Sequence, residues 1–248
     1  PPVLRRDDQG RPVTCWDEVT VKIHPVTGQE VPDEAAQKEI WDYPGAHPAS
    51  WPDADYVVGN PPFVGNKRMR GALGHGYTEA LRAAYPEVPA TADLVMYWWE
   101  KAARRCREGR LRQFGLITTN SLTQVFNRGV VAAHLDATPP VRLRFAIPDH
   151  PWVDAELGAA VRIAMTVAAA GDGADEPPRL GAVVREAPGA DPGSLEVELA
   201  WQAPDRIHAN LTGGADVGRA VPLRANQRLS FQGMNLVGQG FRVSRQEV

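Results

Sequence analysis

A short apolar run that ends at two consecutive prolines constrains this chain more than any other feature. The run is Tyr56-Val57-Val58-Gly59, and Asn60-Pro61-Pro62-Phe63 follows it directly. Proline has no backbone N–H and a fixed φ, so it cannot continue the hydrogen-bonded ladder inside a sheet. The pattern therefore predicts a buried strand that stops abruptly and delivers Asn60 to a sheet edge.

Helical and strand-like segments alternate after this turn. Apolar residues recur at helical spacing from Thr91 to Arg112, which predicts a long amphipathic helix. Residues Phe114 to Thr119 form the next strand-like run, and Asn127 to Ala137 indicate a short helix. Two strands joined through a helix pair in parallel within one sheet. We therefore expect an α/β fold.

The later part of the chain indicates a change of strand direction. Two apolar runs, Val141 to Ile147 and Ala159 to Ala169, have no helical segment between them. They predict an antiparallel hairpin at the edge of the sheet. Residues 171–193 are rich in Gly, Pro, Asp and Glu and predict a loop, with another strand around Leu195 to Trp201.

Composition excludes several classes of protein. The 248 residues are 43% hydrophobic, enough to bury the core of one large domain. No apolar run reaches the ~18 residues of a membrane span. Cys15 and Cys106 lie too far apart for a zinc knuckle, so we expect no metal site, no disulfide scaffold and a cytoplasmic location.

Charge is distributed unevenly along the chain. The net charge is −3, yet residues 56–128 carry eleven basic and five acidic side chains. Residues 201–248 carry six basic and three acidic ones, whereas residues 1–55 carry five basic and eleven acidic ones. Such patterning permits a basic face for nucleic acid on an acidic protein. The alternative is a set of solvated helix faces without a partner.

A strand followed by Asn-Pro-Pro-aromatic resembles the catalytic motif of amino-group methyltransferases that use S-adenosylmethionine. Most of the chain resembles the catalytic module of the class I adenine-specific DNA methyltransferases fused into large restriction-modification and phage-defence enzymes. The segments that carry this wider resemblance are Phe63 to Arg70, Ala92 to Val95, Gly115 to Ser121, His24 to Glu34, Pro148 to Asp154, and Leu211 to Val217. The resemblance implies a Rossmann-like sheet, S-adenosylmethionine as cofactor and double-stranded DNA as partner.

The chemistry of that reaction explains the residue types in the turn. The 6-amino nitrogen of adenine is a poor nucleophile because its lone pair is delocalised into the ring. Two acceptors for its N–H protons redirect the lone pair, and the Asn60 side-chain oxygen and the Pro61 carbonyl can supply both. Prolines Pro61 and Pro62 make the turn rigid, and Phe63 can stack on the base.

Asn60, Pro61, Pro62 and Phe63 are therefore the predicted catalytic residues. Asn60 and Pro61 are also predicted to contact the cofactor. The alternative is that the four residues only terminate a strand and that Phe63 belongs to the core.

The resemblance also implies that the target adenine is flipped out of the duplex. Trp152 matches best the second aromatic that contacts such a base, although it could also be an apolar plug on the hairpin. Basic residues Lys67, Arg68 and Arg70 follow the catalytic turn and are predicted to neutralise DNA phosphates, with a plain solvated loop as the alternative.

The chain departs from the family pattern in one respect. Neither a glycine-rich turn after a first strand nor an acidic residue that ends a second strand precedes Asn60. We therefore expect residues 1–50 to be an irregular lead-in, 51–200 to be the acceptor-side, C-terminal half of the methyltransferase sheet, and 201–248 to begin a target-recognition domain. The main cofactor motif would then lie upstream, and the isolated chain should have little activity.

Two other functions remain open from the sequence. Protein-glutamine methyltransferases use a similar Asn-Pro-Pro-Tyr motif to hold a side-chain amide. A non-catalytic DNA-binding or specificity module could also retain the motif as a relic. Phe63 and the basic residues behind it favour DNA over a protein substrate.

Overall fold

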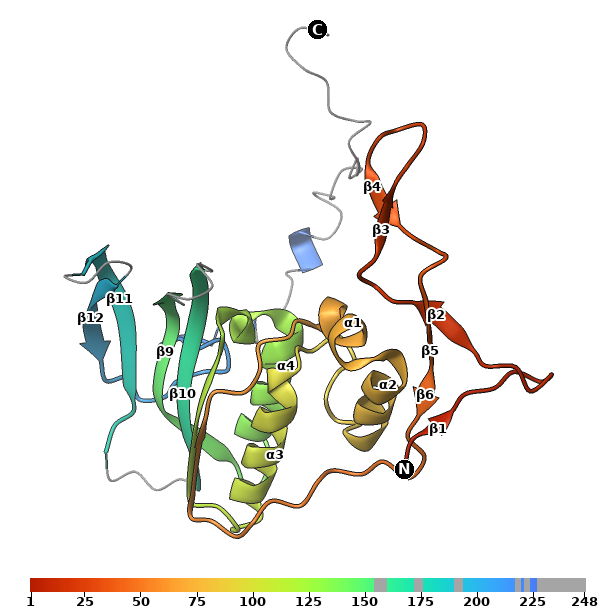
Figure 1. Ribbon diagram of the computed structural model, residues 1–248. Helices are drawn as coiled ribbons and strands as arrows, with labels where there is room; N and C mark the ends of the chain where they lie inside the picture. Colours follow the sequence, from red (N-terminus) through yellow and green to blue (C-terminus); the bar gives the residue numbers. More distant parts are fainter. Residues whose placement is uncertain (154–159, 172–175, 190–193, 217–219, 221–223, 227–248) are drawn as a thin grey trace, which may run out of the picture. The chain divides into compact units, whose positions relative to one another are not determined.

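The computed structural model describes residues 1–153, 160–171, 176–189, 194–216, 220 and 224–226 (Figure 1). Contacts divide the chain into two units, Pro1–Ala215 and Asp216–Val248. The second unit contains one described element, the 3-10 helix η4 (Arg224–Asn226). Residues 227–248 of the expected target-recognition region and 154–158 of the expected hairpin loop lie outside the described residues. In the described part, no helix is long and apolar enough to cross a membrane.

The first unit contains a six-stranded mixed sheet, and Figure 1 labels four of its strands, β9 to β12. Its strands lie in the order β12-β11-β9-β10-β8-β7. Their bounds are β7 (Tyr56–Gly59), β8 (Gln113–Thr119), β9 (Val141–Val153), β10 (Ala160–Ala170), β11 (Arg179–Pro188) and β12 (Leu195–Gln202). The α/β class predicted from the sequence is thus confirmed.

The strand directions determine which side chains meet at one end of the sheet. Strand β7 pairs in parallel with β8, as predicted, and Gly59 lies opposite Leu116. Strand β10 runs antiparallel to both β8 and β9, so Ile163 lies opposite Thr119 on one side and opposite His150 on the other. The carboxyl ends of β7, β8 and β9 therefore meet at the same end of the sheet.

Two predictions about the β12 edge of the sheet are wrong. The antiparallel β9–β10 hairpin is present, but it lies inside the sheet, because β11 and β12 continue beyond β9. Strand β11 occupies part of the segment 171–193, which the composition predicted to be a loop. The Trp201 ring and the Ile147 side chain close over Gly181, where a Cβ would lie only 2.9 and 3.1 Å away. Neighbouring strands, and not local β propensity, thus stabilise β11.

Two helices cover one face of this sheet (Figure 1). They are α3 (Val95–Arg107), shorter than the predicted helix, and α4 (Val125–Leu135). The Trp99 ring is fully buried and packs edge-on against Phe114 at a centroid distance of 5.2 Å. Its indole N–H donates a 3.4 Å hydrogen bond to the Thr166 hydroxyl, which satisfies the polar atom of a large core residue.

The same interface buries an ionisable pair. The His134 Nε2 lies 2.6 Å from the Glu100 carboxylate, and both side chains are almost completely buried. The Arg104 guanidinium donates a second hydrogen bond to Glu100 at 2.8 Å. Burial alone would raise the pKa of Glu100, but the hydrogen bonds from His134 and Arg104 outweigh it and hold this pKa below its ordinary value.

Strand β7 forms the opposite edge of the sheet. Val57 packs against the hydrophobic core, whereas Tyr56 and Val58 point to the other side and are exposed, Val58 to 87%. The strand itself was predicted correctly, but it is not buried, because no described residue covers its second face. Alternate residues of β8 on that face are also only half-buried.

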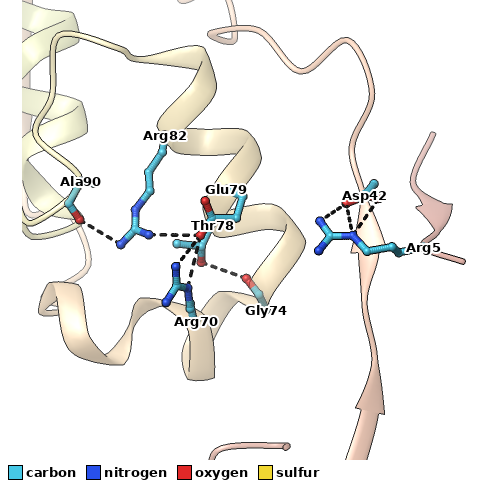
Figure 2. Close-up of polar contacts among 8 residues, drawn as sticks. All are labelled: Arg5, Asp42, Arg70, Gly74, Thr78, Glu79, Arg82 and Ala90. Atoms are coloured by element: carbon cyan, nitrogen blue, oxygen red, sulfur yellow. Dashed lines mark hydrogen bonds and ion pairs between the residues drawn. The ribbon is translucent and has the colours of Figure 1, made fainter. Parts of the chain in front are cut away.

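Residues before β7 form three two-stranded ribbons and a connecting segment. The ribbon strands are β1 (Val3–Leu4), β2 (Thr14–Trp16), β3 (Val21–Ile23), β4 (Glu30–Pro32), β5 (Gln37–Glu39) and β6 (Trp41–Asp42). The Arg5 guanidinium joins β1 to β6 through an ion pair with Asp42 (Figure 2).

Three helical segments that the sequence did not predict follow the turn after β7. They are η1 (Asn66–Arg68), α1 (Met69–Leu73) and α2 (His75–Ala84). Helix α2 packs against β6 at Gly76, where a Cβ would lie 1.7 Å from the Trp41 carbonyl oxygen. Only glycine allows the helix backbone to approach the strand this closely.

Candidate active site

The Asn60-Pro61-Pro62-Phe63 turn leaves β7 at the end of the sheet where the strand ends converge. Asn60 and Pro62 are exposed, Pro61 is buried and Phe63 is half-buried. Among the described residues, none makes a hydrogen bond with the Asn60 side chain or with the Pro61 carbonyl. The turn is therefore anchored by one proline ring and leaves two oxygen acceptors unoccupied.

Asp93 connects this turn to two other segments. Its Oδ1 accepts a hydrogen bond from the Asn66 backbone N–H at 3.0 Å. Its Oδ2 accepts from the Ser121 hydroxyl at 2.7 Å and from the Asn127 side-chain amide at 2.8 Å. The Leu94 N–H, next in the chain, donates to the Val64 carbonyl at 2.9 Å. One carboxylate thus joins the turn, the segment after β8 and the start of α4.

The residues of this network were not among the site residues predicted from the sequence. Asp93 and Ser121 lie in two of the segments that carry the family resemblance. The resemblance therefore indicated these two positions, although not their contact. Asn127 is buried, and its amide uses both its donor and its acceptor to hold Asp93. Nothing in the local sequence indicates that these side chains meet, because Asp93 is separated from Asn127 by 34 residues.

An open cavity of about 530 Å³ lies beside the turn. Phe63, Lys67 and Arg68, all predicted site residues, line it together. The complete lining consists of Phe63, Gly65, Asn66, Lys67, Arg68, Thr91, Asp93, Gln124, Phe126 and Asn127. Of the turn, only Phe63 lines this cavity, whereas Asn60, Pro61 and Pro62 do not. Phe63, the loop after the turn and the first turn of α4 therefore form one site.

The three predicted DNA-contacting cations differ in their surroundings. Lys67 and Arg68 are exposed in η1 and form no ion pair with any described residue. Arg70, in α1, forms an ion pair with Glu79 of α2 at 2.7 Å (Figure 2). The Arg70 hydrogen bond outweighs partial burial and lowers the pKa of Glu79, so Glu79 stays charged. The structure thus brings Lys67 and Arg68, but not Arg70, to the cavity.

Trp152 lies near the carboxyl end of β9, opposite Val161 of β10, and is 37% exposed. Strands β10 and β8 separate β9 from β7. The end of β9 reaches the end of β8 through a 3.1 Å hydrogen bond from Asn120 to Asp149. Trp152 does not line the cavity beside Phe63. Its assignment as the second aromatic of the base pocket stays a prediction.

The mixed sheet and the strand that ends in an Asn-Pro-Pro-Phe turn are those of a DNA-methyltransferase domain. Residues 16–176 match the family described as "MmeI, DNA-methyltransferase domain", and the chain belongs to this family. This confirms the DNA-methyltransferase resemblance seen in the sequence. The family region ends before β11, the strand that composition had indicated to be a loop.

A solved structure of the Type IIL restriction-modification enzyme MmeI in complex with DNA has a similar fold. The match has a TM-score of 0.50 and 22% sequence identity, and it covers 65% of this chain. The aligned part is 20% of the MmeI chain, so this chain corresponds to about a fifth of that enzyme. No curated protein matches the chain.

Proposed function

We propose that this chain is the acceptor side of an adenine-specific DNA methyltransferase of a restriction-modification or phage-defence enzyme. The reaction transfers a methyl group from S-adenosylmethionine to the exocyclic amino group of an adenine flipped out of duplex DNA. The observation that carries the proposal is the turn after β7. Its Asn60 and Pro61 acceptors bind no described residue, and its Phe63 lines a cavity together with two cations that pair with no described residue.

The turn can activate the amine without a charged base. Asn60 Oδ1 and the Pro61 carbonyl would accept hydrogen bonds from the two N–H groups of the amine, so that the nitrogen lone pair points toward the methyl donor. Prolines at 61 and 62 present no N–H that would compete for that lone pair, and they hold the acceptors rigidly. Phe63 supports the base from the cavity side.

The cofactor supplies an electrophilic methyl group when it is bound. The chain fits the reacting end of that cofactor, because the groups at the turn are oxygen acceptors rather than N–H donors. We place Asn60 and Pro61 next to the methyl group and assign the remaining contacts to another part of the same protein. The exposed face of β7, with Val58 87% exposed, supports that assignment, since apolar side chains on an outermost strand are normally covered.

Strand β7 is the outermost strand of the described sheet, which supports the proposed organisation. Residues 51–200 form the C-terminal half of a Rossmann-like methyltransferase sheet, and the cofactor-binding half continues the sheet beyond β7. Residues 1–50 are a lead-in, and 201–248 begin the target-recognition region. Lys67 and Arg68 lie in η1, where they can neutralise phosphates of the strand that carries the target adenine.

The test uses the complete protein that contains this chain. Methyl transfer from radioactive S-adenosylmethionine to DNA is measured for the wild type, for Asn60→Ala and for Gln29→Ala, an exposed amide in the lead-in that serves as control. We expect Asn60→Ala to lower the rate by two to three orders of magnitude, roughly the effect of deleting one preorganised polar group, with DNA affinity nearly unchanged. Gln29→Ala should behave as wild type.

Mass spectrometry of the nucleosides should identify N6-methyladenine. Methylation of a protein glutamine instead of DNA would assign the chain to the alternative enzyme class. Equal methyl-transfer rates for the wild type and Asn60→Ala would leave only the alternative of a non-catalytic DNA-binding module. Robust transfer by the isolated 248-residue chain would contradict the division into two halves.

A further inference from the structure

A second cavity lies between helix α2, helix α3 and the segment that leads from β6 to β7. It has a volume of about 270 Å³, and none of the residues that line it also lines the cavity beside Phe63. Its aromatic lining residues are Tyr43, Trp51, Tyr77, Tyr85, Tyr97 and Trp98. The proposed methyl transfer uses none of these side chains. We call this site the α2–α3 cavity.

Four of the rings form two edge-on pairs. Tyr85 and Tyr97 are both buried, and their ring centroids lie 5.5 Å apart. The ring centroids of Tyr43 and Tyr77 lie 5.6 Å apart, and these side chains are 36% and 43% exposed. The cavity therefore has a buried aromatic pair and a second pair that solvent reaches. Aromatic groups pack best edge-on or offset against other rings, so this lining favours a flat aromatic ligand.

One polar atom of this lining is buried without a partner. The Tyr97 side chain is only 3% exposed, and its hydroxyl makes no hydrogen bond of normal length with a described residue. Burial raises the pKa of Tyr97 more than the neighbouring Arg82 guanidinium lowers it, so the hydroxyl keeps its proton. Buried tyrosine hydroxyls normally have a hydrogen-bond partner. A ligand with an oxygen acceptor would supply one.

The charge of the lining indicates which acceptor fits. Lys101 lines the cavity, with its ammonium 4.6 Å from the centroid of the Trp51 ring, and no described acidic residue lines it. Burial and the charge of Arg105 lower the pKa of Lys101, so an anion beside the ammonium would be stabilising. Tyr97 and Lys101 are four residues apart in α3 and therefore project from the same face of the helix. One anionic group can thus approach both side chains.

We propose that the α2–α3 cavity binds a planar aromatic molecule that carries a carboxylate or another anionic group. The volume of about 270 Å³ is near the lower end of small-molecule sites, about 300 Å³, and limits the molecule to one or two fused rings. The ring packs among the tyrosine and tryptophan rings, Tyr97 donates a hydrogen bond to the anionic group, and Lys101 attracts its charge. This inference goes beyond the proposed function and does not depend on it.

The experiment measures binding of two probes to the full chain by saturation-transfer difference NMR. The probes are 2-naphthoate and 2-naphthylmethylammonium, which share one ring system and differ in the sign of their charge. We expect a dissociation constant of about 1 mM or lower for 2-naphthoate, and binding at least about tenfold weaker for the cation. Tyr97→Phe should weaken 2-naphthoate about tenfold. Lys101→Met should weaken 2-naphthoate and leave the cation unchanged.

Two alanines of α2 provide a matched pair of variants. Ala80 lines the cavity, whereas Ala83 is exposed and does not line it. Ala80→Leu fills the cavity and should abolish binding of 2-naphthoate, while Ala83→Leu adds the same side chain outside and should bind it as the wild type does.

Three results would overturn the inference. They are the absence of binding to the wild-type chain, equal affinity for the two probes, and an equal loss in Ala80→Leu and Ala83→Leu. The measurement is repeated on the complete protein that contains this chain, where 2-naphthoate should also bind. Binding by the full chain but not by the complete protein would show that another part of that protein covers the cavity, and would likewise overturn the inference.

Discussion

Asp93 and Asn127 are joined by two hydrogen bonds that run in opposite directions. The Asn127 side-chain amide donates to the Asp93 carboxylate at 2.8 Å, and the Asp93 backbone N–H donates to the Asn127 side-chain oxygen at 2.9 Å. This pair fixes the start of α4 to the segment that holds the Asn60-Pro61-Pro62-Phe63 turn. It also requires that one partner is an amide and the other a carboxylate.

Replacing Asn127 with aspartate should therefore destabilise the fold at neutral pH. Asn127→Asp removes a donor and places a second carboxylate against Asp93, and we expect a loss of about 1–3 kcal/mol in the free energy of unfolding. The repulsion raises the folded-state pKa of the introduced carboxyl. The deficit should therefore shrink as pH falls below that pKa. Urea unfolding at pH 8 and pH 5 measures the difference in free energy of unfolding between the wild type and Asn127→Asp. An equal difference at the two pH values would contradict this explanation.

The buried Glu100–His134 pair predicts a different dependence on pH. The pKa of Glu100 is lowered in the folded state, so its contribution is complete at neutral pH and is lost as pH falls through the folded pKa, below the ordinary value of 4.5. Glu100→Gln should cost about 1–3 kcal/mol at pH 7, and this difference from the wild type should diminish below pH 4.5. The exposed Glu108→Gln is the control. A constant difference across this range would argue against a charged Glu100.

Two glycines offer a test of helix packing with opposite expected signs. Gly76→Ala would place a Cβ 1.7 Å from the Trp41 carbonyl oxygen, so α2 and β6 must separate, and we expect a loss of at least about 2 kcal/mol. Gly129 lies in α4, and its hypothetical Cβ has no atom within 4 Å apart from its chain neighbours and its own helix backbone. Gly129→Ala should stabilise by about 0.5–1 kcal/mol. Thermal unfolding measures the stability of both variants. Equal stability changes in Gly76→Ala and Gly129→Ala would refute the close contact between Gly76 and Trp41.

Lys67 and Arg68, which pair with no described residue, predict a change in the salt dependence of DNA binding. Each phosphate contact contributes about 0.9 to the slope of log affinity against log salt concentration. The double variant Lys67→Ala with Arg68→Ala should therefore lower the slope by about 1.8. Arg70→Ala should change it much less, because the Arg70 charge is paired with Glu79 at 2.7 Å. A change as large for Arg70 as for one of the other two would show that this ion pair opens on DNA.

Local patterns in the sequence were sufficient where one segment determines its own structure. The prolines at 61 and 62 end β7 where they were predicted to, because the backbone restriction is a property of those residues. Apolar periodicity likewise located α3 and the β9–β10 hairpin. The helix ends were less accurate, since α3 begins at Val95 and not at Thr91. The family resemblance was carried by the same local motifs.

Packing between distant segments decided the rest. Strand β11 exists because β9 and β12 pair with it and Trp201 covers Gly181, although its own composition indicates a loop. The Asp93 network joins residues that lie 27 to 34 positions apart. Phe126 belongs to the cavity only because that network places α4 beside the turn. The sequence by itself determined the turn after β7, whose rigidity is local, while the tertiary structure decided which aromatic rings and charges surround it, because those contacts exist only after the chain has packed.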